Sequence, residues 1–242
     1  RLTPAAFQPA FVLPQWPVGV TIWVPGSTAG FLVTIERRAL SADIELSIEG
    51  LPTGWQGSVA VASGATAVPK VLMTITAPAD AQLGDSTSFR VVGKAVLKGE
   101  TIQREAVPLT SYVGTDRQVC RVSPVARAVV AQDHQTWLDC DLAEIEATQG
   151  DVLEVPVKVL PLDKGGELSL IANLAGKSFR CNLGVPLKIK VEDGVAKFPI
   201  KTENLAPGVH TITVAKAWAS ETRKGMPGPC TPAILLKIQA KK

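Results

Sequence analysis

The sequence predicts an all-β fold made of antiparallel β-sandwiches, and three observations lead to this prediction. Apolar residues alternate with polar or small residues along most of the chain, as in strands that bury one face. Turn-forming residues separate these segments about every 10 to 15 residues, with no helical pattern between them. The segments of the first half also recur in the second half.

The first half contains five segments with strand alternation. They are residues 18–24, 31–36, 44–49, 71–76 and 89–92. One further segment, residues 123–131, has helical features, because Ser123 can cap a helix and Pro124 can occupy its first turn. Its end is rich in valine, which favours a strand, so we expect a strand there.

The internal repeat predicts two units with the same strand order. The matched segments are residues 31–36 with 153–158, 43–48 with 167–172, 79–84 with 203–208, and 89–92 with 212–214. They are offset by 122 to 124 residues, so the register barely changes between them. We therefore expect one unit at residues 1–114 and a second at 115–242. The short polar stretch 114–117 between them predicts a brief and fairly stiff linker.

A motif in the first half resembles a known family. Gly50-Leu-Pro-Thr-Gly54 is followed by a strand with a T-x-T-like pattern, then by Ala79-Asp-Ala-Gln-Leu-Gly84 and Phe89. This run is similar to bacterial immunoglobulin-like modules, whose pattern reads roughly GLPxG…LTxxAxxxAxxGxYxVxVxG. Such modules occur in tandem in secreted and cell-surface proteins, notably of planctomycetes, and beside peptidase or glycosidase domains.

The resemblance covers most of residues 8–108 and, more loosely, 137–240. In the second half, Ala172-Asn-Leu-Ala-Gly176 replaces the Gly-Leu-Pro-x-Gly motif. The resemblance implies two tandem immunoglobulin-like antiparallel β-sandwiches and an accessory or scaffolding role outside the cytoplasm. It carries no catalytic residues to transfer.

Composition excludes several classes of protein. A hydrophobic fraction of 46% and a charged fraction of 19% exclude an intrinsically disordered chain. A net charge of +3 gives no electrostatic footprint for nucleic acid. Charged residues, glycine or proline interrupt every apolar run, so we expect no membrane span. The chain begins at Arg1 without a leader-like segment, and we expect a processed chain or part of a longer protein.

The four cysteines, Cys120, Cys140, Cys181 and Cys230, all lie in the second half. Their even number favours two disulfides and an oxidising compartment, so we expect an extracellular, periplasmic or cell-surface location. Buried free thiols are the alternative. A zinc site is the least favoured reading, because no C-x-x-C pair is present. Three pairings of four cysteines remain open.

The densest group of potential metal ligands is Asp133, His134, Asp139, Asp141 and Glu144. Oxygen ligands and a histidine suit a metal ion. The spacing lacks the tight alternation of acids and the glycine of a calcium loop, which favours a solvated loop instead. We therefore expect no metal and no cofactor.

Catalytic patterns are absent from the sequence. There is no G-x-S-x-G elbow and no phosphate-binding G-x-x-x-x-G-K-[ST] loop, and His210 lies in a plain strand pattern. Carboxylates sit mostly at the outward positions of alternating strands. The sequence therefore predicts a chain that is not an enzyme.

Tryptophans provide the main alternative function, because exposed aromatic rings can stack on sugars. We expect Trp55 at the rim of a sandwich, since it follows a turn. The full set is Trp16, Trp23, Trp55, Trp137 and Trp218. The basic pairs Arg37–Arg38 and Lys241–Lys242 are interpreted as solvated strand edges.

The favoured function is a non-catalytic structural or interaction segment of an exported bacterial protein, with a protein partner or other domains of a larger protein. The alternatives are a carbohydrate-binding module and an accessory module of a larger secreted hydrolase or peptidase. Clustered exposed tryptophans would favour glycan binding.

Overall fold

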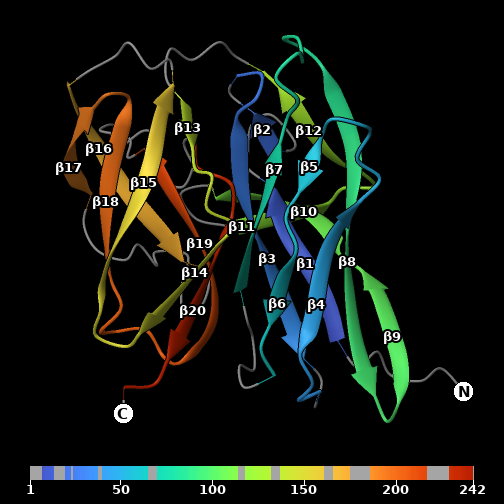
Figure 1. Cartoon of the computed structure of the whole chain (residues 1–242). Helices are drawn as coiled ribbons and strands as arrows, with labels where there is room; N and C mark the ends of the chain where they lie inside the picture. The colour runs from blue at the N-terminus through green and yellow to red at the C-terminus, as the bar shows by residue number, and fades with distance from the viewer. Residues whose placement is uncertain are drawn as a thin grey trace, which may run out of the picture.

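The computed structural model describes ten segments of the chain. They are residues 7–13, 20–22, 24–37, 40–64, 70–113, 118–131, 137–160, 166–174, 186–216 and 229–241. Within these segments the regular elements are all strands. The described residues therefore contain no candidate for a membrane-spanning helix. The strands form two units that lie side by side (Figure 1).

The N-terminal unit consists of two sheets. The first has the order β11-β10-β1-β3-β7-β5, with bounds β1 Phe7–Leu13, β3 Thr28–Arg37, β5 Gln56–Gly57, β7 Lys70–Thr76, β10 Val107–Val113 and β11 Gln118–Val122. The second has the order β2-β12-β8-β4-β6 with β9 beside β8, and its bounds are β2 Val20–Ile22, β4 Ile44–Glu49, β6 Ala60–Ala62, β8 Ser86–Leu97, β9 Glu100–Glu105 and β12 Ala126–Val130.

The core of this unit lies between its two sheets, and the alternation of each strand explains which residues enter it. Phe31 and Ile35 of β3 are buried against Ile44 and Leu46 of β4 and the residues around them. The rings of Phe31 and Phe89 have centroids 5.6 Å apart at an interplanar angle of 47°. Two apolar faces therefore close on each other, as the period of two predicts.

The C-terminal unit is one continuous sheet that curls around its own core. Its order is β13-β15-β18-β17-β16-β19-β20-β14. The bounds are β13 Trp137–Asp139, β14 Glu144–Thr148, β15 Val152–Leu160, β16 Gly166–Leu174, β17 Leu187–Glu192, β18 Val195–Lys201, β19 Gly208–Lys216 and β20 Ile234–Gln239. A two-residue turn at Asp193–Gly194, with φ of 49° and 74°, joins β17 to β18.

The two units share their main strand pairings. The antiparallel pairs β3–β7 and β4–β8 of the N-terminal unit are matched by β15–β18 and β16–β19. In both units an early strand also pairs in parallel with a late one, β1 with β10 and β14 with β20. The prediction of an all-β fold with two immunoglobulin-like β-sandwiches is therefore confirmed. The segment at 123–131 contains a strand, β12, as expected.

The change of unit comes later in the chain than the expected boundary between residues 114 and 115. Stretch 114–117 itself lies outside the described residues. The strands that follow it still belong to the N-terminal sheets, because β11 pairs with β10 and β12 pairs with β8. The physical reason is burial: Ala126, Ala128 and Val130 alternate into the N-terminal core. The sheets change from one unit to the other between Val130 and Trp137.

Candidate interaction site at the junction of the two units

Strands β3 and β7 are buried on both faces. Their inner residues, such as Phe31 and Ile75, belong to the N-terminal core. Their outer residues are also buried: Thr28 is 1% exposed, and Leu72 and Thr74 are similarly covered although they are not part of that core. A second layer must therefore cover the outer face of these strands.

Strand β19 of the C-terminal unit has the same double burial. Ile212 and Val214 belong to the C-terminal core, whereas Thr213 and Ala215 on the opposite face are buried outside it. Strands β19 and β7 contact each other. The outer face of β19 and the outer face of β3 and β7 therefore cover one another, and we call this contact, together with residues 229–231, the junction.

The segment around Cys230 connects the two sheets at the junction. The Cys230 N–H donates to the Thr28 carbonyl over 3.3 Å, and Cys230 forms isolated β-bridges with both Thr28 and Ala215. On the β19 side, the Thr231 N–H donates to the Val214 carbonyl over 2.9 Å. The Val214 N–H returns a bond to Thr231 Oγ1 over 3.0 Å. A short extended segment thus pairs with strands of both units.

Small side chains allow this close approach. A Cβ atom at Gly30 would lie 3.6 Å from Cys230 Sγ and 3.4 Å from Leu72 Cδ1. Cys230 is 1% exposed, and burial raises the pKa of its thiol to about 12. The thiol is therefore protonated at neutral pH, and Sγ lies 3.6 Å from the Thr28 carbonyl as a weak donor.

The cysteines give no disulfide among the residues that the structure describes. Cys140 and Cys230 are both buried free thiols. Burial also raises the pKa of Cys140. Cys181 lies outside the described residues, and Cys120 lies in β11 at a position of which only the backbone is described. At Cys140 and Cys230 the structure therefore shows the alternative of buried free thiols and not the favoured disulfides, whereas a disulfide between Cys120 and Cys181 stays a prediction.

The acids near residue 140 do not converge. Asp133 and His134 lie outside the described residues. Asp139 Oδ1 accepts a hydrogen bond from the Cys140 N–H over 2.8 Å, and Asp141 pairs with Lys158 at 2.6 Å, which raises the pKa of that lysine. Glu144 pairs with Lys237 (a different strand), so each acid has its own partner. In the described part of the chain, no three potential ligands gather at one point.

The described histidine and tryptophans contact other parts of their own units. His210 Nε2 lies 2.7 Å from the Ala206 carbonyl within its own unit. Trp55 is half-buried against the N-terminal core, at the rim position expected for it. Trp137 is half-buried in β13. Trp16, Trp23 and Trp218 lie outside the described residues, so the structure does not test them as a sugar platform.

Arg37 has a role that the sequence reading missed. The sequence predicts a solvated strand edge for it, but its guanidinium is half-buried and donates to four backbone carbonyls. Nη1 bonds to the carbonyls of Leu40 and Ala42, and Nη2 to those of Ala62 and Ser63, over 2.5 to 3.2 Å. Desolvation lowers the pKa of Arg37, and Asp43 partly offsets this. Alternation alone cannot reveal such a network, because a strand-end arginine has the same pattern when it is solvated.

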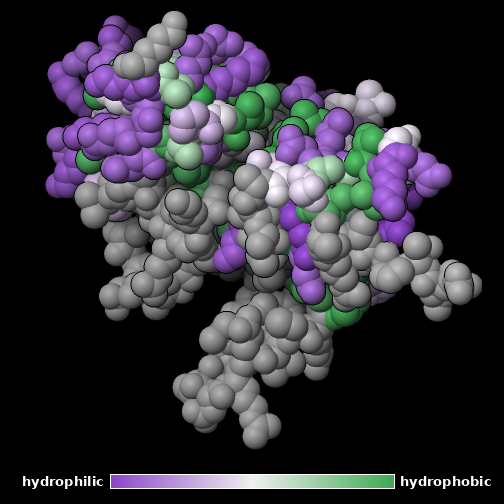
Figure 2. All heavy atoms as spheres, turned by 90° about the horizontal axis from the view of Figure 1, so that it is seen from below, coloured by the Kyte–Doolittle hydropathy of each residue, from purple (hydrophilic) through white to green (hydrophobic). Residues whose placement is uncertain are grey.

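A shallow surface pocket of about 250 Å³ lies on the N-terminal unit between β4, β8 and the start of β12. Three charged residues line it, Glu49, Arg90 and Glu105, and two of them are paired, since Arg90 Nη2 lies 3.2 Å from Glu49 Oε2. Seen from below, polar residues cover much of the described surface and hydrophobic residues appear in smaller areas between them (Figure 2). Among the described residues, the junction combines buried polar and apolar side chains outside the two cores.

The chain was compared with protein families, curated proteins and solved structures. No family model matches the chain. No curated protein matches it either. Among solved structures, the chain is similar to the fibronectin(III)-like modules of Clostridium thermocellum CbhA, with 12% identity over 96% of this chain and 95% of that chain and a TM-score of 0.29. A TM-score of 0.29 is too low to support a fold assignment. The strand pairings described above support it instead.

Proposed function

We propose that this chain is a non-catalytic structural and interaction segment of an exported bacterial cell-surface or secreted protein. It acts as a spacer or scaffold that holds two β-sandwiches in one fixed relative orientation. The observation that carries this proposal is the junction, in which Cys230 pairs with both Thr28 and Ala215 and the outer faces of β3, β7 and β19 bury each other.

The junction restricts the relative motion of the two units. Units joined only by a linker move independently, whereas an extensive buried contact removes this freedom. At the junction, Thr28 and Thr213 are buried, so separating the units would expose the apolar Leu72 and break the Cys230–Thr28 bond. A segment with this property fixes the position of one β-sandwich relative to the other. The resemblance of its motifs to immunoglobulin-like modules supports a place outside the cytoplasm.

The experiment uses two arginine substitutions on the same face of β19. Ala215→Arg places a long charged side chain in the junction. Val209→Arg is the matched control, because Val209 lies on the same face of the strand but is 54% exposed. Small-angle X-ray scattering of the full chain measures the radius of gyration, and calorimetry counts the thermal transitions.

For the native chain and for Val209→Arg we expect one compact shape and one coupled transition. For Ala215→Arg we expect a larger radius of gyration and two separate transitions, with the far-ultraviolet circular dichroism of β-structure retained. An Ala215→Arg chain with native shape and a single transition would contradict the proposal. A native chain that already scatters as two freely moving bodies would contradict it as well.

A further inference from the structure

The edge strands of the three sheets differ in how they are protected from pairing with another chain. Natural edge strands are kept short or carry charges, which prevents strand addition. Here β2, β5, β6 and β13 have only two or three residues. Strand β14 is longer but carries Glu144 and Glu146, and β9 carries Glu100, Arg104 and Glu105.

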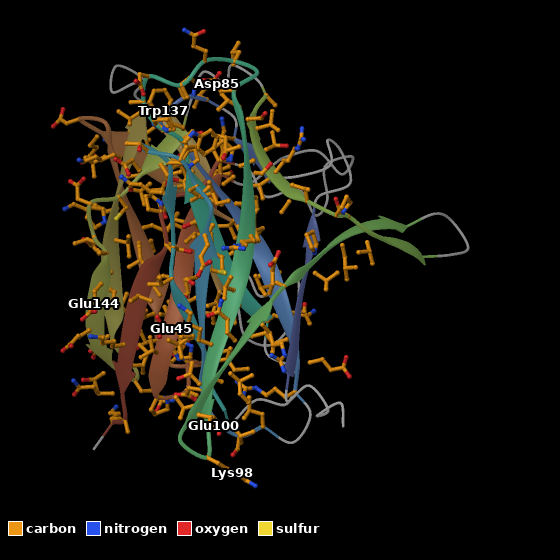
Figure 3. The ribbon with its side chains drawn as sticks, turned by 90° about the vertical axis from the view of Figure 1, so that its right-hand side faces the viewer. Glu45, Asp85, Lys98, Glu100, Trp137 and Glu144 are labelled. Carbon is orange, nitrogen blue, oxygen red and sulfur yellow. The ribbon has the colours of Figure 1, made fainter. Side chains whose placement is uncertain are left out.

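Strand β11 has less of either kind of protection than the other edge strands of five or more residues. It has five residues, Gln118–Val122, with Arg121 as its one charge, and among the described residues only β10 pairs with it. Val122 is 68% exposed, more than any other large hydrophobic side chain that the structure describes. The ribbon of β10 and β11 also projects from the body of the N-terminal unit (Figure 3).

The projecting part of this ribbon has only two strands. Strand β1 pairs with β10 as far as Thr110, whereas β11 pairs with β10 from Leu109 to Val113. A two-stranded antiparallel ribbon is marginally stable by itself in water. A third strand along β11 would therefore stabilise it.

The register shows which backbone groups the outer edge of β11 offers. The Ser123 N–H donates to the Pro108 carbonyl over 2.8 Å, and hydrogen-bonded positions alternate along an antiparallel pair. Val119 and Arg121 therefore bond toward β10. The N–H and carbonyl groups of Gln118, Cys120 and Val122 point away from β10, to an edge that no described strand covers.

We propose that β11 pairs antiparallel with β11 of a second copy of this chain, about a twofold axis through Cys120. This inference rests on the proposed interaction function and names its partner. The two six-stranded sheets then join edge to edge, and the contact closes as a dimer because both copies use the same surface.

The sequence of β11 suits pairing with itself. Cys120 is the central residue, so Gln118 of one copy faces Val122 of the other, and Val119 faces Arg121. Arg121 of one copy therefore never lies opposite Arg121 of the other copy. Such a pair of like charges would be unfavourable. The three outward residues of each copy supply about six backbone hydrogen bonds. The exposed Val122 gains a neighbour in the same contact.

The test measures self-association of the full chain under reducing conditions, by sedimentation velocity from about 1 to 100 μM, the range in which contacts of modest affinity form. We expect the 25.5 kDa chain to shift to twice that mass as concentration rises. Cys120→Pro removes an outward N–H and leaves the bonds to β10 in place, so the dissociation constant should rise at least about tenfold. Cys120→Ser keeps the N–H and should retain the native constant.

A second pair of variants tests the register without a proline. Gln118→Asp with Val122→Asp places carboxylates opposite each other in the dimer, and Gln118→Lys with Val122→Lys does the same with ammonium groups. Each double variant should be monomeric alone, and the mixture of the two should form a dimer. Because mixing restores pairing only in folded chains, loss of folding cannot imitate this result.

Cross-linking gives an independent measure of the axis. Residues facing each other in a hydrogen-bonded antiparallel pair have Cα atoms about 5.5 Å apart, within the span of a disulfide. Molecular oxygen with a copper catalyst takes one hydrogen from each thiol and should link two native chains through Cys120. Cys120→Ser should abolish this link.

A chain that stays monomeric over the whole concentration range would overturn the proposal. A dimer that Cys120→Pro and both charged double variants leave unchanged would also overturn it, since the contact would then lie elsewhere. These outcomes are separate from failure of the proposed function, because Ala215→Arg is read by the shape of the monomer and β11 by the mass of the dimer.

Discussion

The two units close the same edge of their sandwiches in different ways. In the C-terminal unit, β17 and β18 form a hairpin, and the pairs Val191–Ala196 and Glu192–Val195 connect the two halves of the sheet through the backbone. In the N-terminal unit the corresponding strands are β6 and β7, which pair with β4 and β3 respectively but not with each other in the part that the structure describes. There, the side chain of Arg37 bonds from β3 to the end of β6.

This difference determines how each unit tolerates substitution. Backbone pairing does not depend on the identity of a side chain, whereas the N-terminal edge depends on one guanidinium and on a close backbone contact at Gly64. We therefore expect single substitutions to open the N-terminal edge far more readily than the C-terminal one.

The largest effect is expected at Gly64. A Cβ there would lie 1.7 Å from the Ser41 carbonyl oxygen, so the loop must move and the 2.7 Å bond from the Gly64 N–H to Asp43 would be lost. Gly64→Ala should lower the free energy of unfolding by about 3 kcal/mol in urea titrations. Gly150→Ala is the control, because its Cβ meets nothing within 4 Å and only its φ of +103° is strained. Equal losses in the two variants would contradict the role of the close contact.

Arg37→Ala should have the next largest effect, a loss of about 2 kcal/mol, because four carbonyls lose a charged donor. Amide hydrogen exchange should show faster exchange in β6 and unchanged exchange in β17 and β18. Arg37→Lys should restore little, since an ammonium group cannot reproduce the planar fork. Unchanged protection of β6 in Arg37→Ala would show that another contact holds this edge.

The junction should weaken at alkaline pH. The pKa of Cys230 is about 12 in the folded protein against an ordinary 9.0, so above pH 9 the unfolded chain loses a proton that the folded chain keeps. The unfolded state then binds fewer protons, and stability falls by about 1 kcal/mol per pH unit between pH 9 and 12. Cys230→Ala should lose this part of the pH dependence. A slope that is the same in both proteins would contradict the burial of this thiol.

The smallest effect concerns the two hairpin turns. Lys98–Gly99 in the β8–β9 turn has φ of 52° and 84°, close to the 49° and 74° of Asp193–Gly194. Asn and Asp tolerate positive φ better than lysine. Lys98→Asn should therefore stabilise the N-terminal unit by about 0.5 kcal/mol, and Asp193→Lys should destabilise the C-terminal unit by a similar amount. Thermal unfolding measures both, and a destabilised Lys98→Asn would show that the lysine has a contact of its own.

Alternation and turn residues predicted the strands well because both are local properties. Strands β3, β4 and β8 lie where the pattern places them, and their counterparts in the second unit do too. The assignment of β12 to a unit failed because the choice of a pairing partner is not local. The buried alanines of β12 are small enough for the core of either unit. Its pairing with the edge of β8 is what places it in the N-terminal unit.

The junction could not be predicted for a related reason. Thr28, Thr213 and Ala215 occupy outward positions of strands, and residues of this size suit solvent as well as a close contact between sheets. The even number of cysteines makes Cys230 a disulfide candidate, whereas a buried thiol between two strands has no distinctive spacing that a sequence could reveal.

The bond between Thr28 and Cys230 has a consequence for the order of folding. Its two residues are separated by 202 positions in the sequence, which makes it one of the most non-local contacts that this chain can form. During synthesis the N-terminal strands are complete long before residue 230 leaves the ribosome, so the outer face of β3 and β7, including Leu72, stays uncovered for that time. The emerging chain therefore passes through a stage in which this outer sheet face is exposed to solvent, and a chaperone that shields it would act before the second sandwich exists.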